Sequence, residues 1–204
     1  MHNQYYRFII EIGRAVIGIY ISYAPSEYIV HHLFMKGQHK MKTVKIQKLT
    51  AEAFAPFGTF ADVLNPSTPS LGGNVHTFYR DASRYYAESS LPLGFSPLVV
   101  KEHGLTVTGA EYHNLSCEGM MPVNDDAIVH VCPANGGQYD VSQTQAFLVP
   151  KGTIITIYPG VFHLLPLPST EKELHCLIIL PERAYVNDFY GVDLDDDNKF
   201  TLEF

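Results

Sequence analysis

The chain has no tryptophan, few cysteines and no cluster of basic residues. Its three cysteines, Cys117, Cys132 and Cys176, are too few and too irregularly spaced for a secreted disulfide framework, and no CxxC pair indicates a zinc knuckle. We therefore expect a reducing, cytoplasmic location. With 21 acidic against 14 basic residues, the net charge of −7 argues against nucleic acid as a partner, because phosphate backbones are bound by basic patches.

What the chain does contain is typical of a folded globular protein. Its 204 residues fit one compact domain, or one domain with an appendage. Apolar residues make up 46% and charged residues 17%, which excludes a disordered chain. The 13 Tyr and 12 Phe supply the aromatic bulk that tryptophan does not.

The first forty residues differ from the rest in charge. They hold four basic residues against two acidic, a net of +2, whereas residues 41–204 hold 10 basic and 19 acidic, a net of −9. Glu11 and Arg14 interrupt the apolar run 8–21, and a charge at mid-bilayer costs about 2.5–3.5 kcal/mol, so we expect no membrane span. The interrupted run and the poor cleavage site at Ala24-Pro25 also argue against a signal peptide.

A second start of translation fits this division. The sequence from Met41 to Ile46, MKTVKI, looks like a genuine N-terminus, and everything after it has globular composition. We therefore expect residues 1–40 to be a non-functional N-terminal extension and residues 41–204 to be the functional domain.

Residues 41–204 have the pattern of an all-β fold. A strand is expected at 43–49, followed by a short helix with Thr50 as its N-cap and Pro56 near its end. Residues 65–73 are expected to form a loop, and 74–97 show no clear period. Pro150-Lys151-Gly152 predicts a tight hairpin turn, and Pro159-Gly160 predicts a second turn. Turn residues separate short β-rich runs at 98–100, 105–113, 127–132, 144–149, 153–158, 161–165 and 174–180, which predict a β-barrel or jelly roll with short helical decoration.

Two histidines and one glutamate form a candidate metal site. The five-residue separation of His113 and Glu118 would place them on opposite faces of one straight strand, so both can face one cavity only if the chain turns between them. His163 follows the Pro159-Gly160 turn. Two imidazoles and a carboxylate suit a divalent metal with open positions, and a barrel mouth is the expected ligand site. The alternative is that each histidine is an ordinary interior residue of the barrel.

Other polar residues are weaker candidates. His130 alternates with Ile128 and Cys132 and is expected to face the barrel interior, whereas His175 lies in an apolar run and is expected to be a structural core or edge residue. Cys117 has no neighbouring pattern of a nucleophile. The acidic pair at 125–126 and the acidic triplet at 195–197 lack EF-hand spacing and are expected in solvated turns.

At these residues a family resemblance emerges. Residues 109–118 resemble the first cupin motif and residues 152–163 the second. Four segments of residues 41–204 are similar in order to the ureidoglycolate lyase family of allantoin and purine catabolism: KIQKLTAEAFAPFG, AEYHNLSCEGMMPVNDDAIVHV, QAFLVPKGTIITIYPGVFHLLPLP and LIILPERAYVNDF. The chain departs from the first motif in having Glu111 where a first histidine is usual.

The resemblance implies a cupin-type jelly-roll catalytic domain, a lyase that releases urea and glyoxylate from ureidoglycolate. It implies a divalent metal held by His113, Glu118 and His163, with nickel, manganese and zinc as alternatives and Glu111 as a fourth ligand or the catalytic base. The anionic substrate needs positive charge in an acidic domain. The metal can supply this charge, helped by Arg183 as a carboxylate-binding residue and by Lys151 as a substrate-binding or catalytic one.

Two alternatives stay open, since a fold does not determine a function. One is a non-catalytic cupin that binds a small acidic or sugar-like ligand, and the other is a cupin metalloenzyme such as an isomerase or dioxygenase. A Glu111 side chain that points into the pocket beside His113 favours catalysis. We also expect a small-molecule partner, no membrane partner and a homodimer.

Overall fold

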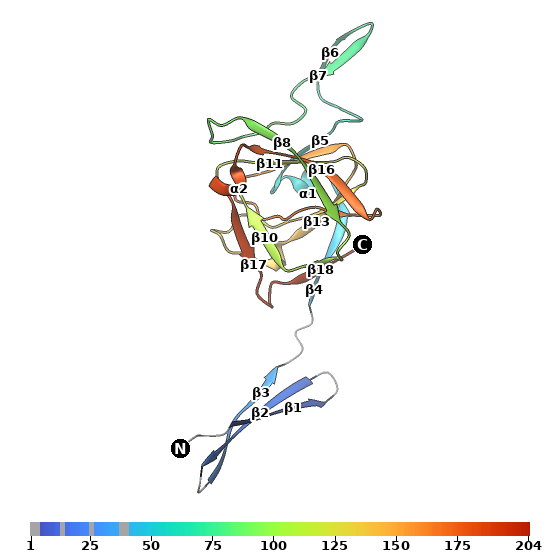
Figure 1. The fold of residues 1–204 in the computed structure, drawn as a ribbon. Coiled ribbons are helices and arrows are strands. Elements are labelled where there is room, and N and C mark those ends of the chain that lie inside the picture. The colour runs from blue at the N-terminus through green and yellow to red at the C-terminus, as the bar shows by residue number, and fades with distance from the viewer. Residues whose placement is uncertain (1–4, 13–14, 25–26, 37–40) are drawn as a thin grey trace. The chain divides into compact units, whose positions relative to one another are not determined.

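The computed structural model describes residues 5–12, 15–24, 27–36 and 41–204, and the chain divides into two compact units, 1–41 and 42–204 (Figure 1). In the first unit, β1 (Tyr5–Ile12), β2 (Ala15–Ala24) and β3 (Glu27–Lys36) form an antiparallel sheet in that order. Arg14 of the apolar run, Pro25 and the residues just before Met41 lie outside the described residues. Among the described residues, no helix is long and apolar enough to cross a membrane. The non-functional role of residues 1–40 stays a prediction.

Two sheets face each other in the second unit and form its barrel-like body (Figure 1). The five-stranded sheet is antiparallel, in the order β5 (Gly58–Asp62), β14 (Thr153–Ile157), β11 (Glu118–Pro122), β16 (Glu173–Pro181) and β8 (Leu93–Lys101). The six-stranded sheet has the order β15 (Leu167–Pro168), β12 (Ala127–Val131), β13 (Gln145–Val149), β4 (Lys42–Lys48), β18 (Phe200–Glu203) and β9 (Thr106–Val107). The expected all-β fold with short helices is confirmed.

Alternation along the strands builds the main core between the two sheets. Met120 and Ile155 face it from the five-stranded sheet, and Val129 and Phe147 face it from the six-stranded sheet. Burying each large apolar side chain contributes about 1.5–3 kcal/mol, so this layer holds the sheets together.

The short helix α1 (Ala51–Phe54) closes this core and matches its prediction. The Thr50 hydroxyl accepts a hydrogen bond from the Ala53 N–H at 3.2 Å, as an N-cap does. Phe54 is buried edge-on against Phe147, with ring centroids 5.3 Å apart.

A second apolar cluster lies on the other face of β12, where Ile128 and Cys132 point. The two-stranded sheet of β10 (Gly109–Tyr112) and β17 (Tyr190–Asp193) contributes to this cluster, as does the 3-10 helix η1 (Val141–Gln143). The helix α2 (Ala184–Asn187) precedes β17. This small sheet is what carries the chain into the candidate site.

Some local predictions are wrong. Residues 150–152 form a tight turn with Gly152 at φ 77°, but β13 and β14 pair in different sheets, so the turn is not a hairpin. The run 161–165 makes only isolated bridges at Phe162 and His163, because these two adjacent residues pair with different segments, Phe162 with Cys132 and His163 with Glu111. The expected loop at 65–73 ends in β6 (Ser70–Gly73), which pairs with β7 (His76–Tyr79).

Candidate metal centre

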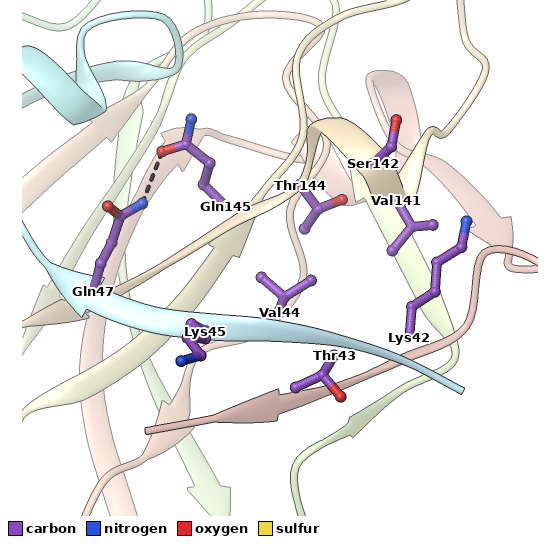
Figure 2. Close-up of a pocket in the computed structure, with 9 residues that line it drawn as sticks. All are labelled: Lys42, Thr43, Val44, Lys45, Gln47, Val141, Ser142, Thr144 and Gln145. Atoms are coloured by element: carbon purple, nitrogen blue, oxygen red, sulfur yellow. Dashed lines mark hydrogen bonds between the residues drawn. The ribbon is translucent and has the colours of Figure 1, made fainter. Parts of the chain in front are cut away.

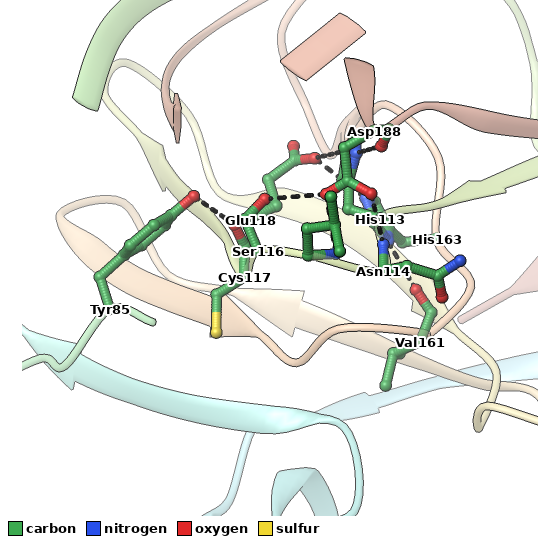
Figure 3. A network of polar contacts seen from close by, with 10 residues as sticks. Tyr85, His113, Asn114, Ser116, Cys117, Glu118, Val161, His163 and Asp188 are labelled. Atoms are coloured by element: carbon green, nitrogen blue, oxygen red, sulfur yellow. Dashed lines mark hydrogen bonds and ion pairs between the residues drawn. The ribbon is translucent and has the colours of Figure 1, made fainter. Parts of the chain in front are cut away.

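Four acidic and imidazole side chains meet at one end of the body. They are Glu111, His113, Glu118 and His163, each of which offers one ligand atom, and these atoms all lie within 4.8 Å of one another. The two histidines and Glu118 are buried, with at most 5% of each residue exposed. Figure 3 shows His113, Glu118 and His163 within one network of polar contacts.

Turns in the backbone bring these residues together. The chain leaves β10 at Tyr112, turns through 113–117 and enters β11 at Glu118, so that His113 and Glu118 face each other. Gly160, at φ 79°, makes the second turn, and its N–H donates to the His113 carbonyl at 2.6 Å. A side chain at this φ would be strained, so glycine suits the turn that delivers His163.

Glu111 is joined to His163 through the backbone. The Glu111 N–H donates to the His163 carbonyl at 2.7 Å, and the His163 N–H donates back to the Glu111 carbonyl at 2.9 Å. Glu111 lies in β10, and its carboxylate belongs to the cluster rather than to open solvent. This is the orientation that favours catalysis over binding alone.

The three buried residues share one carboxylate oxygen. Oε2 of Glu118 lies 3.0 Å from Nε2 of His113 and 3.0 Å from Nε2 of His163. The two imidazole centroids are 5.6 Å apart. Two Nε2 atoms and a carboxylate oxygen that converge in this way could hold a metal ion.

The opposite ring nitrogens have backbone partners. Nδ1 of His113 donates to the Asp188 carbonyl at 2.5 Å, and Nδ1 of His163 donates to the Val161 carbonyl at 2.9 Å. A proton held on Nδ1 leaves the Nε2 lone pair of a neutral imidazole for a metal, and such partners orient metal-binding histidines. The residues present therefore fit a divalent metal.

Asp188 is the functional residue that sequence reasoning missed. Its buried carboxylate accepts hydrogen bonds from the Asn114 N–H at 2.8 Å, the Leu115 N–H at 2.9 Å and the Ser116 hydroxyl at 3.4 Å. Together with its carbonyl on His113, it holds the whole turn between β10 and β11 (Figure 3). Its one sequence signal is its place in the segment LIILPERAYVNDF.

Charge within the cluster separates its two carboxylates. Burial raises the pKa of Glu118, but the charge of His163 and hydrogen bonds from both histidines outweigh burial and lower this pKa to about 2. Burial lowers the pKa of His113 and of His163, yet Glu118 reverses the effect and raises both. Glu111 has a raised pKa because burial, with a smaller contribution from Glu118, outweighs the histidines. Glu118 is thus the permanent anion, and Glu111 is the carboxylate better suited to take up a proton.

The structure does not bring Lys151 or Arg183 into this cluster. Lys151 is exposed in the turn before β14, whereas Glu118 pairs with Ile157 at the other end of that strand. At about 3.3 Å per residue, the four steps along β14 separate these ends by about 13 Å. Arg183 is exposed just before α2, which leads into Asp188 at the end that holds the cluster.

The remaining candidates have other surroundings. His130 is buried, its two ring nitrogens have no hydrogen-bond partner among the described residues, and burial lowers its pKa to about 3. The expected core or edge position of His175 is wrong, because its side chain is 50% exposed on an interior strand and pairs with Glu173 at 3.0 Å. Cys117 is buried, and burial raises the pKa of its thiol. The expected solvated turn at Asp125 is also wrong, since this residue is only 8% exposed.

A separate groove lies on the six-stranded sheet, between β4 and the η1 segment (Figure 2). It has a volume of about 420 Å³ and is lined by Lys42, Thr43, Val44, Lys45, Gln47, Val141, Ser142, Thr144 and Gln145. Gln47 donates to Gln145 across it at 2.8 Å. None of the four cluster residues lines this groove.

Comparison with known proteins adds two findings. Residues 33–198 match the model of a family described as a domain of unknown function, DUF4867. The chain is 30% identical over 166 residues to the ureidoglycolate lyase of Burkholderia mallei, covering 78% of this chain and 86% of the relative. It is 32% identical over 138 residues to the putative ureidoglycolate lyase of Agrobacterium fabrum (65% and 80% covered), and 28% identical over 125 residues to the ureidoglycolate lyase of Rhodobacter capsulatus (60% and 77%).

Proposed function

Because the chain belongs to the ureidoglycolate lyase family and to the DUF4867 domain family, we propose that it cleaves ureidoglycolate into glyoxylate and urea. The observation that carries this proposal is the buried cluster, in which two oriented imidazoles face Glu118 and the carboxylate of Glu111 lies within reach.

The reaction needs a base that removes the proton of the substrate hydroxyl. Ureidoglycolate carries a carboxylate, a hydroxyl and a urea group on one carbon. Loss of the hydroxyl proton lets the C–O bond become a carbonyl while the C–N bond breaks, and the departing urea nitrogen takes a proton. We assign the base to Glu111, whose raised pKa suits it to hold the hydroxyl proton and then to release it toward the urea nitrogen.

His113, Glu118 and His163 would hold the divalent metal. When bound, it would supply a Lewis acid for the substrate carboxylate and hydroxyl, lowering the pKa of the hydroxyl. The low pKa of Glu118 keeps an anion at the site, and the backbone carbonyls on Nδ1 keep both imidazoles oriented. The anion and the two oriented imidazoles would thus hold the positive charge of the metal in an acidic domain.

Arg183 is our proposed residue for the substrate carboxylate. It is an exposed arginine at the end of the unit that holds the cluster, and a guanidinium binds a carboxylate with two hydrogen bonds. Lys151 lies at the far end of β14, so its placement supports neither of the roles expected for it. All three cysteines are free, which supports a reducing, cytoplasmic location.

The test is a product assay on the full chain. With ureidoglycolate and nickel, manganese or zinc supplied in turn, glyoxylate and urea should form in equal amounts and faster than by spontaneous decay. Glu111→Gln should lower kcat by at least 100-fold, as loss of a general base does, whereas the exposed Glu88→Gln should leave it unchanged. Product formation at the background rate with every metal would refute the lyase activity.

A further inference from the structure

In the small sheet of β10 and β17, the residue directly opposite Glu111 is a glycine (Figure 1). Gly191 of β17 is the register partner of Glu111 in this antiparallel pair. Side chains of directly opposed residues project from the same face of a sheet, with Cβ atoms about 4.5–5.5 Å apart. A side chain at Gly191 would therefore lie beside that of Glu111, and glycine leaves this space open.

The fold does not require glycine at this position. The φ of Gly191 lies outside the left-handed region, so the backbone would accept another residue without strain. Apart from its chain neighbours, the only described atoms within 4 Å of a Cβ built at Gly191 belong to the Phe189 ring, at 3.1 and 3.3 Å. Both residues are exposed, so no core packs against this Cβ position. A strand glycine of this kind often marks a place that a ligand approaches closely.

The Phe189 ring lies on the same face of the sheet as the Glu111 side chain, because its atoms lie against the Cβ position opposite Glu111. The residues on both sides of Phe189 are held in place. Asp188 is buried and accepts hydrogen bonds from a backbone turn, and the Tyr190 ring stacks on Tyr112 with centroids 5.0 Å apart. Phe189 is nevertheless 48% exposed. The backbone thus holds a phenyl ring in solvent beside the assigned base.

The cluster is open to solvent on the side of Glu111. This residue is half-buried, whereas His113, Glu118 and His163 are each at most 5% exposed. A substrate that reaches the three buried residues therefore has to pass Glu111, and with it the open space over Gly191.

The proposed reaction determines which part of the substrate occupies this space. Glu111 takes the proton of the hydroxyl and releases it toward the urea nitrogen, so the hydroxyl oxygen and the urea nitrogen both have to lie within reach of one carboxylate. The substrate carboxylate and hydroxyl are turned toward the metal-binding residues. The ureido group is the substituent that remains, and it is planar, as is the ring beside the open space.

We propose that Gly191 and Phe189 form a ureido subsite, in which Gly191 leaves room for the ureido group beside Glu111 and the Phe189 ring packs on its flat face. This inference rests on the proposed lyase function and adds the residues that select its substrate. Small-molecule sites are commonly built in this way, from an apolar surface and a few polar groups that fix the orientation.

The first test compares two stable analogues by titration calorimetry on the full chain with zinc supplied. Ureidoacetate has the carboxylate and the ureido group of the substrate without its hydroxyl, and glycolate has the carboxylate and the hydroxyl without the ureido group. Gly191→Val and Phe189→Ala should each raise the Kd of ureidoacetate by about tenfold or more and change the Kd of glycolate by less than about twofold. Gly191→Ala should have a smaller effect, and Phe189→Tyr, which keeps the ring, should bind ureidoacetate as the wild type does.

Two control variants make the same changes away from the cluster. Gly73→Val adds a side chain at an exposed glycine of β6, where a Cβ would lie 3.7 Å from the His76 ring, and Phe204→Ala removes a ring that is 68% exposed at the C-terminus. Both should leave the two Kd values unchanged. A wild type that does not bind ureidoacetate, an unchanged Kd of ureidoacetate in both subsite variants, or an equal rise of both Kd values would overturn the proposal.

Kinetics with ureidoglycolate separate this proposal from the lyase activity. Phe189→Ala should raise KM by about tenfold with kcat little changed, because the ring contacts the ureido group before and during the reaction. A wild type without lyase activity, in which Gly191→Val still weakens ureidoacetate alone, would refute the lyase and keep the subsite. An active wild type whose subsite variants bind ureidoacetate normally would refute the subsite and keep the lyase.

Discussion

Two buried aspartates organise loops at different places on the five-stranded sheet, and only one of the loops carries a histidine. Asp188 accepts hydrogen bonds from the turn 114–116, and its carbonyl holds His113. Asp125 accepts hydrogen bonds from the N–H groups of 169–171 in the same manner, with no cluster residue attached. In both places a buried aspartate holds a loop through backbone N–H groups. The loop held by Asp188 carries His113 of the candidate site, whereas the loop held by Asp125 carries no residue of the site and contributes to stability alone.

The largest expected effect is at the ligands themselves. His113→Ala and His163→Ala each remove one Nε2, so metal affinity should fall by more than about 100-fold, beyond the loss expected for an outer partner. Titration calorimetry with zinc on each metal-free variant measures this loss, and His175→Ala, at an exposed histidine, is the control. Unchanged zinc binding in both cluster variants would disprove the ligand assignment.

The second largest effect is on metal affinity, and it should distinguish Asp188 from Asp125. Asp188→Asn replaces one of the two carboxylate oxygens that accept these hydrogen bonds with an NH2 group, which is a donor, so the turn that carries His113 should loosen. We expect metal affinity to fall by about 10–100-fold, the usual cost of a lost outer partner. Asp125→Asn is the matched change at the other end and should leave metal affinity unaltered. Equal losses in the two variants would mean that Asp188 acts only on the fold.

The effect of Asp125 should appear in the free energy of unfolding rather than in metal affinity. Burial raises its pKa, but hydrogen bonds from Thr170 and Glu171 outweigh burial and hold the pKa well below its ordinary value. A depressed pKa stabilises the fold above the unfolded value of about 3.9, and this stabilisation is lost as pH falls below it. Asp125→Asn should lower the free energy of unfolding by about 2–3 kcal/mol at pH 7 and by less at pH 3. Urea titrations at both pH values measure the difference, and an equal loss at pH 3 would contradict the assigned cause.

The comparison also shows what a sequence can predict. The all-β class and the convergence of His113, Glu118 and His163 follow from turn residues and from the five-residue spacing, which are local signals. Neither aspartate has such a signal, because the partners of Asp188 lie 72 to 75 residues away and include backbone N–H groups that any residue supplies. The Pro, Ser and Gly residues of 65–73 predict a loop, yet residues 70–73 form β6 and pair with β7, because pairing with a distant or neighbouring strand is not written in the composition of a short segment.

The smallest expected effect tests which end receives the substrate. Arg183 precedes the helix that leads to Asp188, whereas the Lys151 N–H donates to Asp126, beside Asp125, at 2.8 Å. If the substrate carboxylate is bound at the cluster end, Arg183→Gln should raise KM by about tenfold, the loss of one charge-assisted contact, with kcat little changed. Lys151→Gln should leave both constants unchanged, since its ammonium lies at the far end of β14. A higher KM in the Lys151 variant alone would place substrate entry at the Asp125 end and separate it from the metal-binding residues.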